Sequence, residues 1–534
     1  MPKQERRSEH SSAAVLVRQS ARRRPRAVFW DTLGPPRSPL PSATPFPSLI
    51  VRATGFAAQG AFAEAQAEFL DPDPEVVARL EALLRSREAG VVAHYYMDAE
   101  LQGVLWACDW PHINISDSLV MADRGVDMAR AGAKEIVVLG VDFMSENVRA
   151  ILDASGFQQV GCWRVAEQPI GCSLAEAAES RAYAAWLEQA AATPNSLHVV
   201  YINTSLRTKA HAHHVVPTIT CTSSNVVATV LQTFAQEPQA HVWFGPDTYM
   251  GQNLARLFAT LLELGDDAIA ALHPAHTSET IRALLPRFHY FEQGNCVVHH
   301  MFGAAVTDQV ERDYYDSPTA NVDVTAHLEV PGEMFALALR AQREGRGVVG
   351  STKNILDHIT AKLDAALAEP AVDPPRRLRF VLGTEAGMVT AIVRALRDRL
   401  AAAERATVEI EIIFPVAAQA VTTTGDTVLP IIPGVSGGEG CSTAGGCATC
   451  PYMKMNSLDA LCDLLERLPA AGSSPSVDRA AVHRELAGYE PRKYGERIAG
   501  KTVAALGTEP ILYMRGFQQT GSLPQQLLAD LRAR

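Results

Sequence analysis

The sequence has 534 residues, a net charge of −11 and 47% hydrophobic residues, which is enough apolar material for about three domains at ~150 residues each. No apolar run approaches the roughly 18 residues that span a bilayer, and no basic stripe with interleaved aromatic residues indicates nucleic-acid binding. We therefore expect neither a membrane segment nor a nucleic-acid partner, and we interpret the nine cysteines as buried thiols, metal ligands or redox groups rather than disulfides.

The N-terminal stretch differs in composition from the rest. Residues 1–60 hold ten basic and three acidic side chains, with six prolines between Pro35 and Pro47. A basic, Ser-rich and acid-poor leader ahead of an acidic body is typical of an organelle transit peptide, and a disordered basic tail is the alternative. We predict residues 1–65 as a disordered leader outside the fold.

From Asp71 onward, apolar runs rich in β-formers alternate with helical stretches rich in Ala, Leu and Arg, which predicts an α/β fold with largely parallel sheets. One pattern occurs three times: a strand, then a Gly-x-acid turn, then a helix. The copies occupy residues 137–152, 242–258 and 380–396, with their turns at Gly140/Asp142, Gly245/Asp247 and Gly383/Glu385. Recurrence of one element in this way indicates internal duplication.

Polar groups precede each copy at similar spacing. Strands with polar tips lie at 91–96, 199–205 and 324–329, and hydroxyl-rich helix starts follow at 116–122, 221–227 and 350–356. Ligands of open α/β sheets bind beyond the carboxyl ends of strands, and helix N-termini offer N–H groups to anions. Three copies could therefore share one pocket. The alternative is that these residues only cap helices, because Ser, Thr and Asn are common N-caps.

A cysteine follows each repeat: Cys172, Cys296 and the pair Cys447/Cys450. Iron–sulfur clusters usually take four Cys ligands, so one thiolate from each repeat would leave one iron open to substrate. These landmarks predict three αβα units. The first covers 66–172 and is completed by 451–534, the second covers 173–296, and the third covers 297–450.

Other interpretations of the cysteines stay open. Structural zinc at Cys447 and Cys450 would need two further ligands, and the sequence has no second CxxC pair. A redox couple at the same pair would leave Cys172 and Cys296 unexplained. Cys441 and Cys447 are either spare thiols or a redox control on the third ligand. We interpret the remaining thiols as core or surface thiols, among which Cys162 is the best substitute for Cys172: Cys108, Cys162, Cys221 and Cys462. We interpret the isolated histidines as structural or solvated: His112, His289 and His211–His214.

From about Asp71 to Met514 the sequence resembles the quinolinate synthase family, especially its plant and algal form. Eleven motifs carry the resemblance, in the order that the family has. They are HYYMDAELQG (94–103), ISDSLVMAD (115–123), LGVDFMSENVRAILD (139–153), GCSLAEA (171–177), VVYINTS (199–205), TCTSSNVV (220–227), CVVHH (296–300), AHLEVPGEMF (326–335), VVGSTKNIL (348–356), GTEAGMV (383–389) and CATCPYMKMNSL (447–458).

The resemblance implies a fold of three homologous αβα domains about a pseudo-threefold axis, with the active site at their junction. It implies condensation of iminoaspartate with dihydroxyacetone phosphate, with loss of phosphate and water, to give quinolinate for NAD biosynthesis. It also implies one [4Fe–4S] cluster that acts as a Lewis acid. Carried over by motif, the cluster ligands are Cys172, Cys296 and Cys450, the catalytic residues are Tyr96, His94, His327 and Glu329, and the substrate-binding residues are Ser118, Tyr201, Asn203, Ser223, Ser351 and Thr352.

The resemblance further implies a plastid location, with the cytoplasm as the alternative, and supply of substrate by an L-aspartate oxidase. Plant members usually carry an N-terminal sulfur-transfer domain, for which the leader is too short, so we expect a separate sulfur-transfer protein. A homodimer is one option for the assembly. Two other functions remain: another open-cluster iron–sulfur enzyme of three domains, against which the HYY, HLE and CTSSN motifs argue, and a binding module stabilised by zinc and cysteine.

Overall fold

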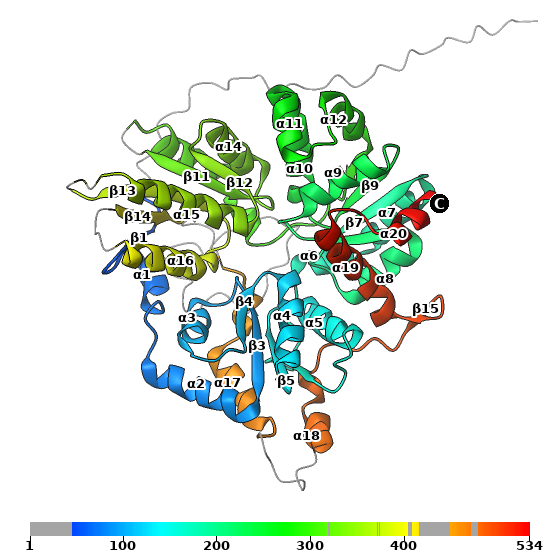
Figure 1. Cartoon of the computed structure of the whole chain (residues 1–534), viewed down its shortest axis with the longest axis horizontal. Helices are drawn as coiled ribbons and strands as arrows, with labels where there is room; N and C mark the ends of the chain where they lie inside the picture. The colour runs from blue at the N-terminus through cyan, green and yellow to red at the C-terminus, as the bar shows by residue number, and fades with distance from the viewer. Residues whose placement is uncertain are drawn as a thin grey trace, which may run out of the picture. The chain divides into compact units, whose positions relative to one another are not determined.

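A computed structural model describes most of the chain (Figure 1). The described residues are 45–318, 321–370, 372, 374–403, 408–415, 449–470 and 479–534. Residues 1–44 of the predicted leader, Cys441 and Cys447 lie outside these ranges. No described helix is long and apolar enough to cross a membrane.

The first unit has a four-stranded parallel sheet in the order β4-β3-β5-β6. Every residue of β3 and β5 is buried, as expected of parallel strands that helices cover on both faces. The elements are α2 (Pro74–Arg87), β3 (Ala89–His94), α3 (Ala99–Ala107), β4 (Ile113–Ser116), α4 (Ser118–Arg130), β5 (Glu135–Leu139), α5 (Asp142–Ala154) and β6 (Gly161–Trp163).

The second unit repeats this arrangement with a parallel sheet in the order β8-β7-β9-β10. Its elements are α6 (Ser173–Ala178), α7 (Arg181–Ala192), β7 (Ser196–Tyr201), α8 (Leu206–Val215), β8 (Thr218–Cys221), α9 (Val226–Gln236), β9 (His241–Gly245), α10 (Thr248–Leu264), α11 (Asp266–Leu272), α12 (Ser278–Leu284), η1 (Leu285–Arg287) and β10 (Phe288–Tyr290).

The third unit has a six-stranded sheet in the order β12-β11-β13-β14-β1-β2. Its elements are β1 (Ser48–Arg52), β2 (Gly55–Gln59), α1 (Ala61–Glu68), η2 (His299–Phe302), α13 (Ala304–Val310), η3 (Glu311–Tyr315), β11 (Val322–His327), α14 (Gly332–Arg343), β12 (Gly347–Gly350), α15 (Thr352–Ala368), β13 (Arg376–Gly383), α16 (Met388–Ala402) and β14 (Val408–Ile413).

The C-terminal segment adds mainly helices. Its elements are η4 (Met453–Met455), α17 (Leu458–Arg467), α18 (Arg479–Glu485), η5 (Ala487–Tyr489), β15 (Arg497–Ile498), β16 (Lys501–Thr502), α19 (Val503–Thr520) and α20 (Gln525–Arg532).

The four parallel strands of each unit share one order in the sheet: second, first, third, fourth in chain order among these four. The predicted α/β class with mostly parallel sheets is therefore confirmed. The shared order is what internal duplication of a strand–helix unit predicts.

Two predicted boundaries need correction. Strands β1 and β2 lie within the predicted leader, yet β1 pairs with β14 and with β2, both antiparallel. Leu49 and Val51 are buried, so the short apolar run that begins at Ser48 belongs to the third sheet. The sequence did not reveal this strand because its pairing partner, β14, follows about 360 residues later.

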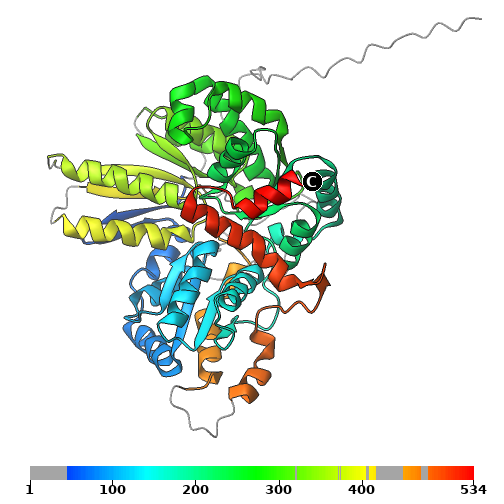
Figure 2. The same cartoon turned by 45° about the vertical axis from the view of Figure 1, so that its right-hand side comes forward.

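The C-terminal segment also divides between two units instead of completing only the first. Helix α17 packs on α2 of the first unit, whereas α19 packs on α8 and β8 of the second (Figure 2). The backbones approach closely at Gly507, where a Cβ atom would lie 2.3 Å from the carbonyl oxygen of Leu206.

Candidate active site

One cavity of about 270 Å³ gathers residues from all three units. His94, Tyr201 and His327 are the last residues of β3, β7 and β11, which are equivalent strands in the three sheets. Twelve of the thirteen predicted site residues line the cavity: His94, Tyr96, Ser118, Cys172, Tyr201, Asn203, Ser223, Cys296, Glu329, Ser351, Thr352 and Cys450. The thirteenth, His327, lies directly behind them, with its Nε2 atom 3.1 Å from the Ser223 hydroxyl.

Helices begin at this cavity in each unit. Ser118 is the first residue of α4, Thr352 is the first residue of α15, and Ser223 lies just before α9. Ser351 caps α15 by accepting a hydrogen bond from the Asn354 N–H group. The free N–H groups and the positive dipole end of a helix favour anions, so the cavity can bind carboxylate or phosphate groups.

The two histidines at strand ends share one geometry. The Nδ1 atom of His94 accepts the N–H of Tyr96 at 3.2 Å, and Nδ1 of His327 accepts the N–H of Glu329 at 3.3 Å. Burial lowers the pKa of each imidazole to about 4, although Glu329 acts in the opposite direction. Both rings are therefore neutral at pH 7, and the accepting role of Nδ1 assigns the proton to Nε2.

Tyr96 lies between the first and third units. Its hydroxyl is 3.3 Å from the Thr352 hydroxyl, and its ring packs edge-on against His94 at a centroid distance of 4.6 Å. Burial raises the pKa of Tyr96 well above 10, and the carboxylates of Glu329 and Glu385 raise it further. The side chain is a neutral phenol that can donate a proton, and its deprotonation would require a nearby cation.

Glu329 is the most strongly contacted carboxylate of the cavity. Tyr201 donates its hydroxyl proton to Oε1, and Oε2 lies 3.1 Å from Nδ1 of His299. Burial acts to raise the pKa of Glu329, but His299, His327 and Tyr201 together outweigh it and hold the pKa below its usual range. Asp247 is equally buried without such neighbours, and burial and the charge of Glu329 raise its pKa.

His299 is a site residue to which the sequence reasoning assigned no role. It is fully buried, and its ring stacks on His327 at a centroid distance of 5.1 Å. Ligand atoms of Cys296, His299 and Glu329 lie within 4.8 Å of one another and could hold a metal ion. The available signal was its spacing, because His299 stands one helical turn after Cys296.

The three predicted thiol ligands have matching surroundings. Cys172, Cys296 and Cys450 form no disulfide and are partly buried, and each precedes a helical turn. Burial raises the pKa of all three thiols. Backbone N–H groups two or three residues further on oppose that rise by pointing toward each sulfur: Leu174 and Ala175, His299, Tyr452 and Met453.

This donor set fits an iron–sulfur centre. Such centres take thiolate ligands whose sulfurs accept backbone hydrogen bonds. A cationic centre would also stabilise thiolates that burial alone disfavours.

Comparisons with known proteins agree with this geometry. The family model described as "Quinolinate synthetase A protein" matches residues 78–484. Proteins named "Quinolinate synthase, chloroplastic" are 51% identical to the chain in Nicotiana tabacum, over 97% of this chain and 69% of the relative, and 51% identical in Arabidopsis thaliana, over 92% and 67%. A rice relative of the same name is 51% identical over 91% and 69%.

The chain thus spans about two thirds of the length of these relatives. The family match and the similarity along nearly the whole chain show that this protein belongs to the quinolinate synthetase A family, iron–sulfur enzymes that form quinolinate for NAD biosynthesis.

Proposed function

We propose that this chain condenses iminoaspartate with dihydroxyacetone phosphate, releases phosphate and water, and holds one [4Fe–4S] cluster on Cys172, Cys296 and Cys450. The observation that carries the proposal is the convergence of three thiols and two polar strand ends, His94 and Tyr201, on a single cavity. His327, the strand end of the third unit, contacts Ser223 of its lining. When bound, a cluster with three protein ligands supplies an open iron that polarises a substrate oxygen or nitrogen.

Tyr96 and His94 are proposed to act at the carbon–carbon bond-forming step. Both are neutral at pH 7, and they contact each other at the end of β3. The phenol can donate its proton to a developing alkoxide, and the Nε2–H group of His94 can orient a substrate oxygen. A positioned acid of this kind contributes typically about 10²- to 10⁴-fold in rate.

Glu329 and His327 are proposed to move the protons that ring formation and aromatisation require. The carboxylate of Glu329 is ionised and held between Tyr201 and His299, so its position is fixed. An ionised carboxylate beside a neutral imidazole can accept a proton from carbon and pass it to a leaving hydroxyl group.

The remaining polar residues are proposed to bind the charged ends of the substrates. Ser118, Ser223, Ser351 and Thr352 lie at helix starts, where hydroxyl donors add to the backbone N–H groups. Asn203 adds amide donors beyond the end of β7. Such donors attract anions locally, although the whole chain is acidic.

We also propose a plastid location, supported by the chloroplastic relatives and by the basic composition of residues 1–60. The partners that the chemistry requires are an oxidase that supplies iminoaspartate and a sulfur-transfer protein that supplies the cluster.

An anaerobic assay tests the proposed reaction. Purified protein is incubated with enzymatically generated iminoaspartate and dihydroxyacetone phosphate, and quinolinate is measured by chromatography. We expect formation by the wild type and none by Cys296→Ser, with Cys108→Ser as a matched control that retains activity. A wild-type protein that contains iron and sulfide but forms no quinolinate would contradict the proposed reaction.

A further inference from the structure

The three Gly-x-acid turns are not used by the proposed reaction, yet each lies beside a cysteine loop. We propose that the turn after the third strand of each unit positions the thiol ligand of the same unit, with Glu385 as the positioning residue for Cys450. The inference rests on the proposed function, because it assumes that these thiols hold the cluster.

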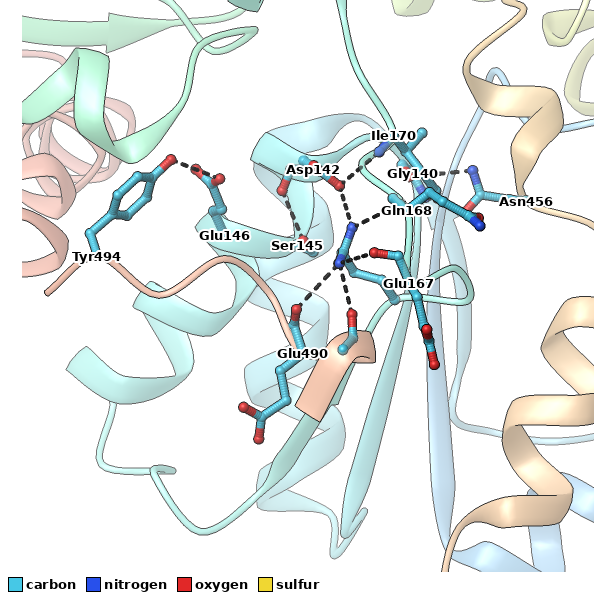
Figure 3. A network of polar contacts seen from close by, with 12 residues as sticks. Gly140, Asp142, Ser145, Glu146, Glu167, Gln168, Ile170, Asn456, Glu490 and Tyr494 are labelled. Atoms are coloured by element: carbon cyan, nitrogen blue, oxygen red, sulfur yellow. Dashed lines mark hydrogen bonds and ion pairs between the residues drawn. The ribbon is translucent and has the colours of Figure 1, made fainter. Parts of the chain in front are cut away.

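In the first unit, Asp142 holds the loop at Ile170, two residues before Cys172 (Figure 3). Its N–H group donates to the Ile170 carbonyl at 2.9 Å, and its Oδ1 atom accepts the Ile170 N–H at 3.2 Å. The same oxygen pairs with Nη1 of Arg164 at 2.8 Å. Two hydrogen bonds to one residue fix both the place and the orientation of the loop.

In the second unit, the residue after Asp247 makes the equivalent pair of hydrogen bonds. The N–H of Thr248 donates to the Gly294 carbonyl at 2.7 Å, and the Gly294 N–H donates to the Thr248 hydroxyl at 3.0 Å. Gly294 again stands two residues before its cysteine, Cys296. A Cβ atom at Gly294 would lie 2.3 Å from the Pro246 carbonyl oxygen, so the loop lies directly against the turn.

In the third unit, the contact reaches the ligand itself. Oε1 of Glu385 accepts the N–H of Cys450 at 2.6 Å, and the Glu385 side chain is 1% exposed. Glu385 also lines the cavity. The glutamate side chain is one methylene longer than the aspartates of the other turns, which lets its carboxyl group bond to the amide of the cysteine.

In all three units the Gly-x-acid turn therefore contacts the loop that carries the cysteine, but it does so in two ways. In the first two, the turn holds the backbone two residues before the thiol. In the third, the acid of the turn accepts the backbone amide of the thiol residue. Loss of an outer contact that orients a metal ligand typically weakens metal binding by about 10- to 100-fold, and Glu385 is the contact that acts most directly on a ligand.

The test compares how fast anaerobically purified variants lose iron to a chelator, followed by visible absorption. Glu385→Gln keeps an acceptor oxygen at the same length, whereas Glu385→Ala removes it and Glu385→Asp shortens it. We expect Glu385→Gln to release iron at the wild-type rate, and Glu385→Ala and Glu385→Asp to release it at least about tenfold faster. Glu333→Ala, an exposed carboxylate in α14, is the control and should match the wild type.

The possible outcomes distinguish a failure of the proposed function from a failure of the positioning role of Glu385. A wild-type protein without iron and sulfide would contradict the proposed function. Wild-type protein that holds its iron, together with Glu385→Ala and Glu385→Asp variants that release iron equally slowly, would overturn the positioning role. Release from Glu385→Gln as fast as from Glu385→Ala would also overturn it, because the acceptor oxygen is retained.

Discussion

Two regions of the molecule differ in what their polar side chains contact. One of them is a hydrogen-bonded cluster, here called the clamp, formed by Asp142, Glu146, Arg164, Lys209 and Tyr494. Figure 3 labels Asp142, Glu146 and Tyr494 of this cluster. In the clamp, polar side chains bond to other parts of the protein. In the cavity, the three thiols, several hydroxyls and the His94 imidazole face a shared space.

The clamp is dense in hydrogen bonds. Arg164 donates to the carbonyl oxygens of Gly488 and Glu490 in the C-terminal segment, besides its pair with Asp142. Lys209, which is fully buried, donates to the carbonyl oxygens of Ile202 and Thr204 on either side of Asn203.

Glu146 completes the clamp by accepting the Leu206 N–H at 3.0 Å and the Tyr494 hydroxyl at 2.9 Å. It therefore joins α5 of the first unit, α8 of the second unit and the C-terminal segment.

The polar groups in and beside the cavity are less fully hydrogen-bonded than those of the clamp. His299 stacks on His327 beside the cavity. Its Nδ1 atom lies 3.1 Å from Glu329, whereas its Nε2 atom has no hydrogen-bond partner within the described residues. A buried polar group left in this way is costly unless a ligand completes it. The comparison therefore indicates that the clamp maintains the fold, whereas the cavity is arranged for what binds there. Substitutions in the clamp and in the cavity should therefore have different effects on stability and activity.

Tyr96→Phe should separate activity from stability most clearly. Quinolinate formation should fall by about 10²- to 10⁴-fold, because the proton donor is lost. The unfolding midpoint should hardly change, because the contact of the hydroxyl with Thr352 is long, 3.3 Å. Steady-state kinetics and a denaturant titration measure the two effects. A large stability loss with normal turnover would place Tyr96 with the clamp.

Lys209→Met should have the reverse effect. Burial lowers the pKa of Lys209 to about 7, and its Nζ atom is a donor to two buried carbonyl oxygens. Removing this donor leaves both acceptors unpaired, at a cost of about 1–3 kcal/mol each in unfolding free energy. As a control, Lys134→Met, at an exposed position, should be neutral. Equal stability of wild type and Lys209→Met by denaturant titration would remove Lys209 from the clamp.

Arg164→Met should destabilise the protein by a smaller amount. Its side chain is 11% exposed and pairs with Asp142, so we expect a loss of about 1–3 kcal/mol from broken charged hydrogen bonds. Limited proteolysis should cut the C-terminal segment around Gly488 faster than in the wild type. Unchanged proteolysis and stability would show that Arg164 does not fasten this segment.

The smallest expected effect is the dependence of stability on pH that His198 causes. Burial lowers the pKa of His198 to about 3, with His213 contributing, and Nε2 of His198 lies 2.8 Å from the Tyr183 hydroxyl. As the pH falls through 6.5, His198 binds a proton in the unfolded state but stays neutral in the folded state. The free energy of unfolding therefore falls. Between pH 7.5 and 5.5 the contribution of His198 alone to this loss is about 1.4 kcal/mol.

The control for this pH effect is a comparison of two variants. His198→Gln should lose the 1.4 kcal/mol dependence, calculated for one proton, whereas His211→Gln, at an exposed position, should keep it. The same pH dependence in all three proteins would contradict the buried neutral state of His198.

Local patterns in the sequence predicted the repeated strand–helix unit, and together with the family resemblance they named twelve of the residues that line the cavity. This was possible because polar strand tips and helix starts such as His94 and Ser118 have signatures within a few residues. The Gly-x-acid turns were visible for the same reason, and Asp142 shows the role that one of them plays.

Contacts between distant segments could not be predicted. Pairing of β1 with β14 and packing of α19 on α8 depend on parts of the chain about 300 residues or more apart. Lys209 looked like an ordinary helix residue in a His-rich stretch, because only the fold buries it against the loop that carries Asn203. His299 lay within a recognised motif, but its stacking on His327 arises from the third sheet.

Iron and acid-labile sulfide content per chain, measured after anaerobic purification, tests the central claim most directly. We expect about four iron and four sulfide ions per chain in the wild type. Both should be lost in Cys172→Ser, Cys296→Ser and Cys450→Ser. The wild-type content should be retained in Cys108→Ser and Cys162→Ser. A colourless wild-type protein that retains zinc instead of iron, or a full cluster in all three ligand variants, would contradict this claim.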